Sequence, residues 1–157
     1  MKYTRLTQEQ LEALHQDFAT FLRAQSIDKA KWDAIKKEQP DLVAQHLDIF
    51  SDLVWEGVLT GTTYLEHYTS NYIFLYHCLE QEMQSIVMHT NETTIDFTTM
   101  EGLQWLKKNL FTEVVDIHLG KKKYDKERNA FLFSLLQQGA FLSEGNLYKE
   151  MNAIINN

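Results

Sequence analysis

Residues 72–79 read Tyr-Ile-Phe-Leu-Tyr-His-Cys-Leu, and this aromatic, β-rich run decides the fold class. A polar Glu-Gln-Glu follows at 80–82, and residues 85–90 form a second short apolar run. Short apolar runs bounded by polar residues are typical of β-strands, so we predict two strands here. A helix across 64–83 is the alternative, because several apolar residues of the first run also fall on one helical stripe.

The residues after this pair predict two more strands with a helix between them. Residues 95–97 alternate between apolar and acidic side chains, which indicates a short strand. A threonine at 98 or 99 then caps a helix that ends at about Leu110. Residues 115–119 alternate again between apolar and polar side chains, and we predict one further strand there.

Capping residues and a proline predict three helices in the N-terminal third of the chain. A capping box at 7–10 begins a first helix over about 8–25. Asp28 caps a second helix, which must end just before Pro40 because a residue that precedes proline avoids the helical region. Pro40 then suits the first turn of a third helix that runs to about Leu59. Its apolar residues cover more than one face, so we expect this helix to be central.

Two further helices are predicted at the C-terminus. Asp125 is expected to cap a helix that ends at Gln138, with Gly139 as the residue after its end. Ser143 is expected to start the last helix. The whole pattern predicts an α+β fold, with a helix-rich N-terminal half packed on a small sheet and two C-terminal helices. An all-α bundle is the alternative, and we predict a single globular domain over 1–157.

Composition narrows the classes of protein that the chain can represent. Apolar residues make up 44% and charged residues 24% of the 157, as in ordinary soluble globular proteins. The net charge is −7, with 15 lysines and arginines against 22 acidic residues, which argues against nucleic acid as a partner, above all against coating a duplex. Neither a secretion signal nor a membrane-spanning run is visible, and the one cysteine cannot form an internal disulfide. We therefore expect a cytoplasmic protein that does not contact membranes.

Common catalytic and cofactor motifs are missing from the sequence. The six glycines are too scattered for a phosphate-binding loop or a dinucleotide fingerprint. Glu12 and His15 form one Glu-x-x-His pair, whereas a dinuclear carboxylate site needs two such pairs. Cys78 has no second cysteine at a spacing that suits zinc. We predict no metal and no cofactor.

An acidic surface on the third helix is the strongest functional candidate. Asp48, Asp52 and Glu56 follow one another at four-residue spacing, beside Trp55. Like charges at that spacing repel each other, so this carboxylate ladder is not there to stabilise the helix. It is either a solvated face or a surface that pairs with basic groups, from an external partner or from the chain's own residues 121–128.

Our leading hypothesis is therefore a non-enzymatic protein-interaction module. Its contact surface would combine the carboxylate ladder and Trp55 with Glu66 and His67, which follow the glycine break after the helix. A small enzyme is the competing hypothesis, with Glu56, Glu66 and His67 lining a pocket for acid–base chemistry. We favour the module, because proximity in sequence does not establish the geometry that catalysis needs.

A weaker alternative is contact with RNA through residues 121–128. Lys121, Lys122, Lys123 and Arg128 are candidate anion contacts in this basic segment. The summed charge is small and the rest of the surface is acidic, so a solvated turn before the next helix is the simpler interpretation.

The chain also resembles a known family over its whole length. The stretches that carry the resemblance are Leu6–Glu12, Asp48–Leu59, Tyr64–His67, Ile95–Thr99 and Glu101–Leu106. They resemble a family of small proteins of unknown function from the Bacteroidota. The resemblance implies a bacterial, cytoplasmic protein, and it implies no activity, cofactor or catalytic residue. The partner and the oligomeric state stay open at this point.

Overall fold

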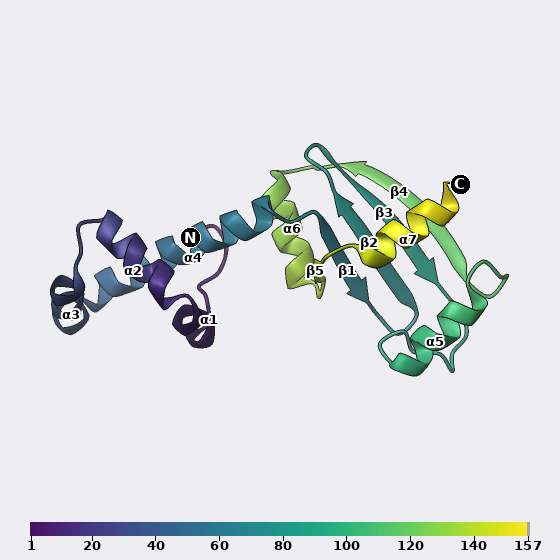
Figure 1. The fold of residues 1–157 in the computed structure, drawn as a ribbon, viewed down its shortest axis with the longest axis horizontal. Helices are drawn as coiled ribbons and strands as arrows, with labels where there is room; N and C mark the ends of the chain where they lie inside the picture. The colour runs from purple at the N-terminus through teal and green to yellow at the C-terminus, as the bar shows by residue number, and fades with distance from the viewer. Residues whose placement is uncertain (157) are drawn as a thin grey trace. The chain divides into compact units, whose positions relative to one another are not determined.

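The computed structural model describes residues 1–156 and divides the chain into two compact units (Figure 1). The first unit is Met1–Thr60 and the second begins at Gly61. Each unit has its own secondary structure and its own apolar core, and each is described by itself below. That residues 1–157 act as one domain stays a prediction.

The first unit contains helices only. They are α1 (Gln8–Ala13), α2 (His15–Ala24), α3 (Lys29–Glu38) and α4 (Pro40–Thr60). The capping box forms as predicted, since the Thr7 side chain accepts from the Gln10 backbone and the Gln10 side chain accepts from the Thr7 backbone. Asp28 caps α3 by accepting from the backbone N–H of Lys31 at 2.8 Å. The single helix predicted over 8–25 is wrong in one respect, because the chain leaves helical geometry at Leu14 and begins a new helix.

Aromatic rings from three helices form the core of the first unit. Phe18 of α2 lies 5.3 Å from Trp32 of α3 in an edge-to-face arrangement and 5.0 Å from Phe50 of α4. Phe21 lies 5.5 Å from Phe50, and His46 stands edge-on to Trp32 at 6.0 Å. Such ring pairs stabilise a fold by more than the apolar area that they bury accounts for. They can therefore stabilise a small helical unit.

The second unit is built on a five-stranded antiparallel sheet. Its strands are β1 (Tyr64–Tyr68), β2 (Tyr72–Cys78), β3 (Glu82–His89), β4 (Asp116–Lys123) and β5 (Phe141–Ser143), in the order β4-β3-β2-β1-β5. The strands predicted at 72–79, 85–90 and 115–119 are confirmed. The α+β fold is therefore correct, and the helix considered across 64–83 is wrong because these residues pair as neighbouring strands.

Three helices accompany this sheet. They are α5 (Met100–Asn109), α6 (Arg128–Gln137) and α7 (Asn146–Ile155), and α7 crosses one face of the sheet in Figure 1. Thr99 caps α5 by accepting from the N–H of Gly102, as predicted. The buried core joins side chains of the sheet to those of α5, α7 and the loops beside them. Its members are Ile73, Leu75, Ile86, Met88, Phe97, Leu106, Val115, Tyr148 and Met151.

Three local predictions for the second unit are wrong. Residues 95–97 form no strand but a bend before α5, and the Phe97 N–H bonds instead to the Ser70 carbonyl. Asp125 does not cap α6, whose first flanking residue is Glu127. Ser143 belongs to β5 rather than to the start of α7, because β1 supplies ladder partners to residues 141–143.

The basic residues 121–123 also differ from expectation. They do not form a solvated turn, because β4 continues through Lys123 in register with Glu82 of β3. The partner strand supplies backbone hydrogen bonds that the local lysine pattern does not reveal. Three lysines in a row therefore lie on an edge strand, with side chains that alternate between the two faces of the sheet.

We predict that His77 makes the second unit less stable in mild acid. The His77 ring stacks on Tyr64 at 4.6 Å and lies 5.3 Å from Tyr148. Burial, and then the charge of Lys149, lower the pKa of His77. The folded state therefore prefers neutral imidazole, so this stabilisation is present above the unfolded pKa of about 6.5 and is lost as the pH falls below it.

Urea unfolding between neutral pH and about pH 5 measures this effect. In His77→Phe the acid decline should be shallower than in the wild type, whereas the exposed control His118→Gln should follow the wild type. Parallel declines for the wild type and His77→Phe would contradict the assignment.

Candidate functional site

The carboxylate ladder of α4 contacts the chain's own N-terminal residues. Both Asp52 oxygens accept backbone hydrogen bonds, from Lys2 N–H at 2.7 Å and Tyr3 N–H at 2.9 Å. Arg5 donates from Nε to Asp48 Oδ1 at 2.6 Å, and this bond lowers the pKa of Asp48. Two rungs of the ladder are therefore occupied within the chain.

The third rung of the ladder has partners in the same N-terminal segment. Glu56 Oε2 accepts from the Tyr3 hydroxyl and from Lys2 Nζ, the latter at 3.2 Å. Burial, and then the bond to Glu56, raise the pKa of Tyr3 to about 12. The three like-charged side chains of the ladder thus all contact one N-terminal segment, residues 2–5, which we call the strap. That an external protein binds this surface stays a prediction. That the half-buried Trp55 contributes to such binding also stays a prediction.

Glu66 and His67 do not form an acid–base pair. They are consecutive residues of β1, so their side chains leave opposite faces of the sheet. Glu66 is buried and accepts hydrogen bonds from the hydroxyls of Tyr68, at 2.9 Å, and Ser143. Burial and the bond to Glu66 raise the pKa of Tyr68. Glu66 therefore has a structural role on the α7 side, joining β1 to β5.

His67 lies on the other face of the sheet, beside a partly exposed row of aromatic rings. Its own ring is 5.7 Å from Phe74 of β2. Phe74 alternates along β2 with Ile73 and Leu75, which are both fully buried beneath α7 and α5. The face that carries His67 is thus the one that points away from the main core.

Three rings follow one another along β2 on this outer face. Tyr72 and Phe74 stack at 5.5 Å with 13° between their planes, and Phe74 and Tyr76 stack at 6.2 Å with 11°. Tyr72 is 36% exposed whereas its neighbour Ile73 is 0% exposed, and Phe74 and Tyr76 are half-buried, so this face of β2 is the more open one at its Tyr72 end. The near-parallel planes make the row a continuous strip of ring surface.

The strip widens onto β3. His89 pairs with Tyr72 across the strands, and their rings are 4.3 Å apart. Val87 pairs with Phe74 on the same face. We call Tyr72, Phe74, Tyr76, Val87 and His89 the aromatic face.

Helix α6 runs along one border of the aromatic face. At its end, Gly139 lies next to the His67 ring, so this end of the helix lies over β1. Phe131 and Leu135 face Tyr76 across a pocket of about 340 Å³. Helix α6 thus approaches the Tyr76 end of the aromatic face, whereas Tyr72 at the other end stays exposed.

Lysines close the far side of this pocket. Lys121, Lys122 and Lys123 line it together with Ser85 and Gly120, and we call the three lysines the lysine edge. Lys122 Nζ lies 5.5 Å above the Phe131 ring and 3.7 Å from an Asp125 carboxylate oxygen. These lysines are exposed, so they can exchange such surface contacts for a ligand at little cost.

Arg128, the fourth predicted anion contact, is used differently. Its guanidinium donates to the backbone carbonyls of Thr62, Cys78 and Leu79, and to Asn129 Oδ1. It therefore ties the start of α6 to the segments that flank β1 and β2. Burial raises the pKa of the Cys78 thiol beside it to about 12, which keeps this cysteine protonated and unreactive.

The sequence patterns did not single out the aromatic face as a site. The alternation in residues 72–79 predicted a strand, but the face that stays open depends on where α6 lies, and no local pattern reports that. Within residues 1–156, no three His, Cys, Asp or Glu side chains come together in a way that could hold a metal ion. In the same residues, no helix is both long and apolar enough to cross a membrane.

The fold and these surfaces define an α+β protein with a partly exposed aromatic sheet face and lysines on the neighbouring edge strand. The chain belongs to the family described as Family of unknown function (DUF6495), which matches residues 1–156. Comparison with curated proteins and with solved structures gave no match.

Proposed function

We propose that this protein is a non-enzymatic, cytoplasmic binding module that holds single-stranded RNA on the aromatic face. One observation carries the proposal: three near-parallel rings of β2 lie in a row that runs from the exposed Tyr72 to the half-buried Phe74 and Tyr76, and β4, separated from β2 by β3, carries three consecutive lysines. Aromatic side chains on an antiparallel sheet are a common platform for unpaired bases. Lysines beside such a platform suit the phosphates that link those bases.

The dimensions of the face suit a few nucleotides. Tyr72 and Tyr76 are four residues apart on one strand, about 13 Å at about 3.3 Å per residue. Sheet platforms of this kind stack about two or three bases. The pocket between Tyr76 and Phe131 is open beside Lys122, so it suits one base with its phosphate at the lysine edge.

The acidic composition of the chain fits unpaired rather than duplex RNA. Duplex binding depends on many phosphate contacts, which a chain with net charge −7 is poorly suited to make. Stacking on aromatic rings instead contributes about 1–3 kcal/mol per base without any net charge. Lys122 is the lysine of β4 that the strand register places on the same face as Tyr76, so the logarithm of the affinity should fall with the logarithm of salt with a slope of only about −0.7.

We place the binding site here rather than on the carboxylate ladder. The ladder is acidic and contacts the strap of residues 2–5, whereas the aromatic face has partly exposed rings and a lysine, Lys122, at its rim. Glu66 and His67 point to opposite faces, which removes the acid–base pair on which the enzyme hypothesis rested. A protein ligand on the aromatic face is a separate proposal, and the experiment below distinguishes it.

Fluorescence anisotropy with a labelled, unstructured RNA oligonucleotide tests the proposal. We expect Tyr72→Thr and Phe74→Thr each to weaken binding by about 5-fold to 100-fold, because each substitution removes one stacking ring while keeping a residue that favours strands. Lys122→Gln should weaken binding modestly and make the salt slope shallower by about 0.7, the value of one lost phosphate contact.

Matched controls come from elsewhere in the second unit. Phe141→Thr removes an exposed aromatic side chain from β5, and Lys107→Gln removes an exposed lysine from α5, so both should bind RNA as the wild type does. A duplex of the same sequence should bind more weakly than the single strand. Wild-type protein that leaves the anisotropy unchanged at about 100 µM, the weak end of non-specific binding, would overturn the proposal and leave a protein ligand as the better explanation of this face.

A further inference from the structure

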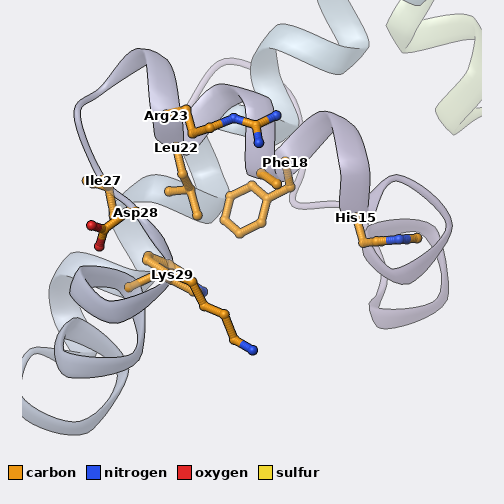
Figure 2. Close-up of a pocket in the computed structure, with 9 residues that line it drawn as sticks. His15, Phe18, Leu22, Arg23, Ile27, Asp28 and Lys29 are labelled. Carbon is orange, nitrogen blue, oxygen red and sulfur yellow. The ribbon is translucent and has the colours of Figure 1, made fainter.

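The first unit contains a groove between α2 and α3, with a volume of about 470 Å³ (Figure 2). Its lining comes from residues 15–23 of α2 and residues 27–32 that lead into α3. Volumes of this size are typical of small-molecule sites. We call it the helical groove, and it is separate from the aromatic face of the second unit.

Apolar side chains form the floor of the helical groove. Phe18, Leu22 and Trp32 are its large members, and Figure 2 shows Phe18 and Leu22 side by side at its centre. The edge-to-face contact with Trp32 and the contact with Phe50 fix the Phe18 ring, while Leu22 is itself buried. This floor is therefore rigid and suited to an apolar chain rather than to a polar ligand.

Cationic side chains stand at the rim. Arg23 and Lys29 lie on opposite sides of the Phe18 ring in Figure 2. His15 precedes Phe18 by about one turn of α2. The one carboxylate of the lining, Asp28, accepts from the Lys31 backbone as the cap of α3. Arg23 uses one donor on Thr20 Oγ1, at 3.2 Å, out of the five that a guanidinium offers.

We propose that the helical groove binds an amphipathic anion with an alkyl chain and a carboxylate head, such as a medium-chain fatty acid. The chain would lie on Phe18, Leu22 and Trp32. The carboxylate would pair with Arg23, because a guanidinium matches a carboxylate in a two-bond geometry, and Lys29 would add a second positive charge. The proposal rests on this complementarity of an apolar floor and a cationic rim, and it is independent of RNA binding.

Isothermal titration calorimetry of the full chain with decanoate, decanol and decyltrimethylammonium separates the contributions of chain and charge. We expect decanoate to bind best, decanol more weakly and decyltrimethylammonium least. Affinity should rise by about fourfold for each methylene added to the carboxylate, until the chain outgrows the groove. Equal affinity for decanoate and decyltrimethylammonium, or no heat with any carboxylate, would overturn the proposal.

Two variants and a control locate the site. Ala19 is an exposed lining residue of α2, so Ala19→Leu fills the groove with a good helix former and should reduce decanoate affinity at least 10-fold. Ala24→Leu adds the same atoms to an exposed position of α2 outside the lining and should bind as the wild type does. Arg23→Gln should weaken decanoate but not decanol. Wild-type affinity in Ala19→Leu would show that decanoate binds elsewhere and would contradict the assignment.

Discussion

Replacing Gly102 with alanine is expected to lower the free energy of unfolding of the second unit by about 3 kcal/mol or more. Gly102 lies in the first turn of α5, where a Cβ atom would come within 1.8 Å of the Asp96 carbonyl oxygen and 3.1 Å of the Phe97 nitrogen. These are backbone atoms, so no side-chain rotation can relieve the clash. The bend at 96–97 must shift, and it carries Phe97, which is fully buried in the core.

Gly57 of α4 provides the matched control for this substitution. A Cβ at Gly57 would meet nothing within 4 Å, so Gly57→Ala replaces a poor helix former in open space. It should raise the stability of the first unit by about 0.5–1 kcal/mol. Chemical denaturation followed by circular dichroism measures both changes. If Gly102→Ala unfolds at the wild-type midpoint, the close approach of α5 to residues 96–97 is wrong.

The elements predicted correctly are those whose signals are local. Asp28 caps α3 and Pro40 begins α4 because capping and proline geometry act within a few residues. The alternation in residues 72–79 likewise identifies β2, since a half-buried strand must present apolar side chains with a period of two. In these segments the local preferences and the tertiary structure agree.

The elements that were missed depend on partners distant in sequence. In β1 the core side carries Glu66, so the strand lacks the usual alternation of apolar and polar residues. Its carboxylate is tolerated there because the hydroxyls of Tyr68 and Ser143 satisfy it. Strand β5 has only three residues, and its pairing with β1 spans more than seventy positions. No local pattern reports either contact.

The same distinction applies to the candidate sites. The spacing of Asp48, Asp52 and Glu56 predicted either a solvated face or a surface that pairs with basic groups. The segment that contacts these carboxylates begins at Lys2, about fifty residues away, and no local pattern pointed to it. Each ring of the aromatic face was visible as part of a strand. Its exposure follows from the path of α6 along β1, which only the three-dimensional structure supplies.

Arg128 gives the second large effect, and it separates a structural role from the predicted contact with anions. In Arg128→Met the carbonyls of Thr62, Cys78 and Leu79 lose a shared donor. A partly buried acceptor without a partner costs about 1–3 kcal/mol, so we expect the second unit to lose about 3 kcal/mol in total. Arg128→Lys should restore little, because a lysine cannot direct donors to three carbonyls in one plane.

Urea denaturation and RNA titration of the same variants decide between the two roles. If Arg128 is structural, Arg128→Met and Arg128→Lys unfold at lower urea concentrations than the wild type, and their folded fraction binds RNA with unchanged affinity. The exposed control Lys126→Met should change neither property. If Arg128 instead contacts phosphate, Arg128→Lys keeps wild-type stability and Arg128→Met binds RNA less tightly. That second pattern would reverse the assignment, because a guanidinium engaged with three carbonyls cannot be removed without loss of stability.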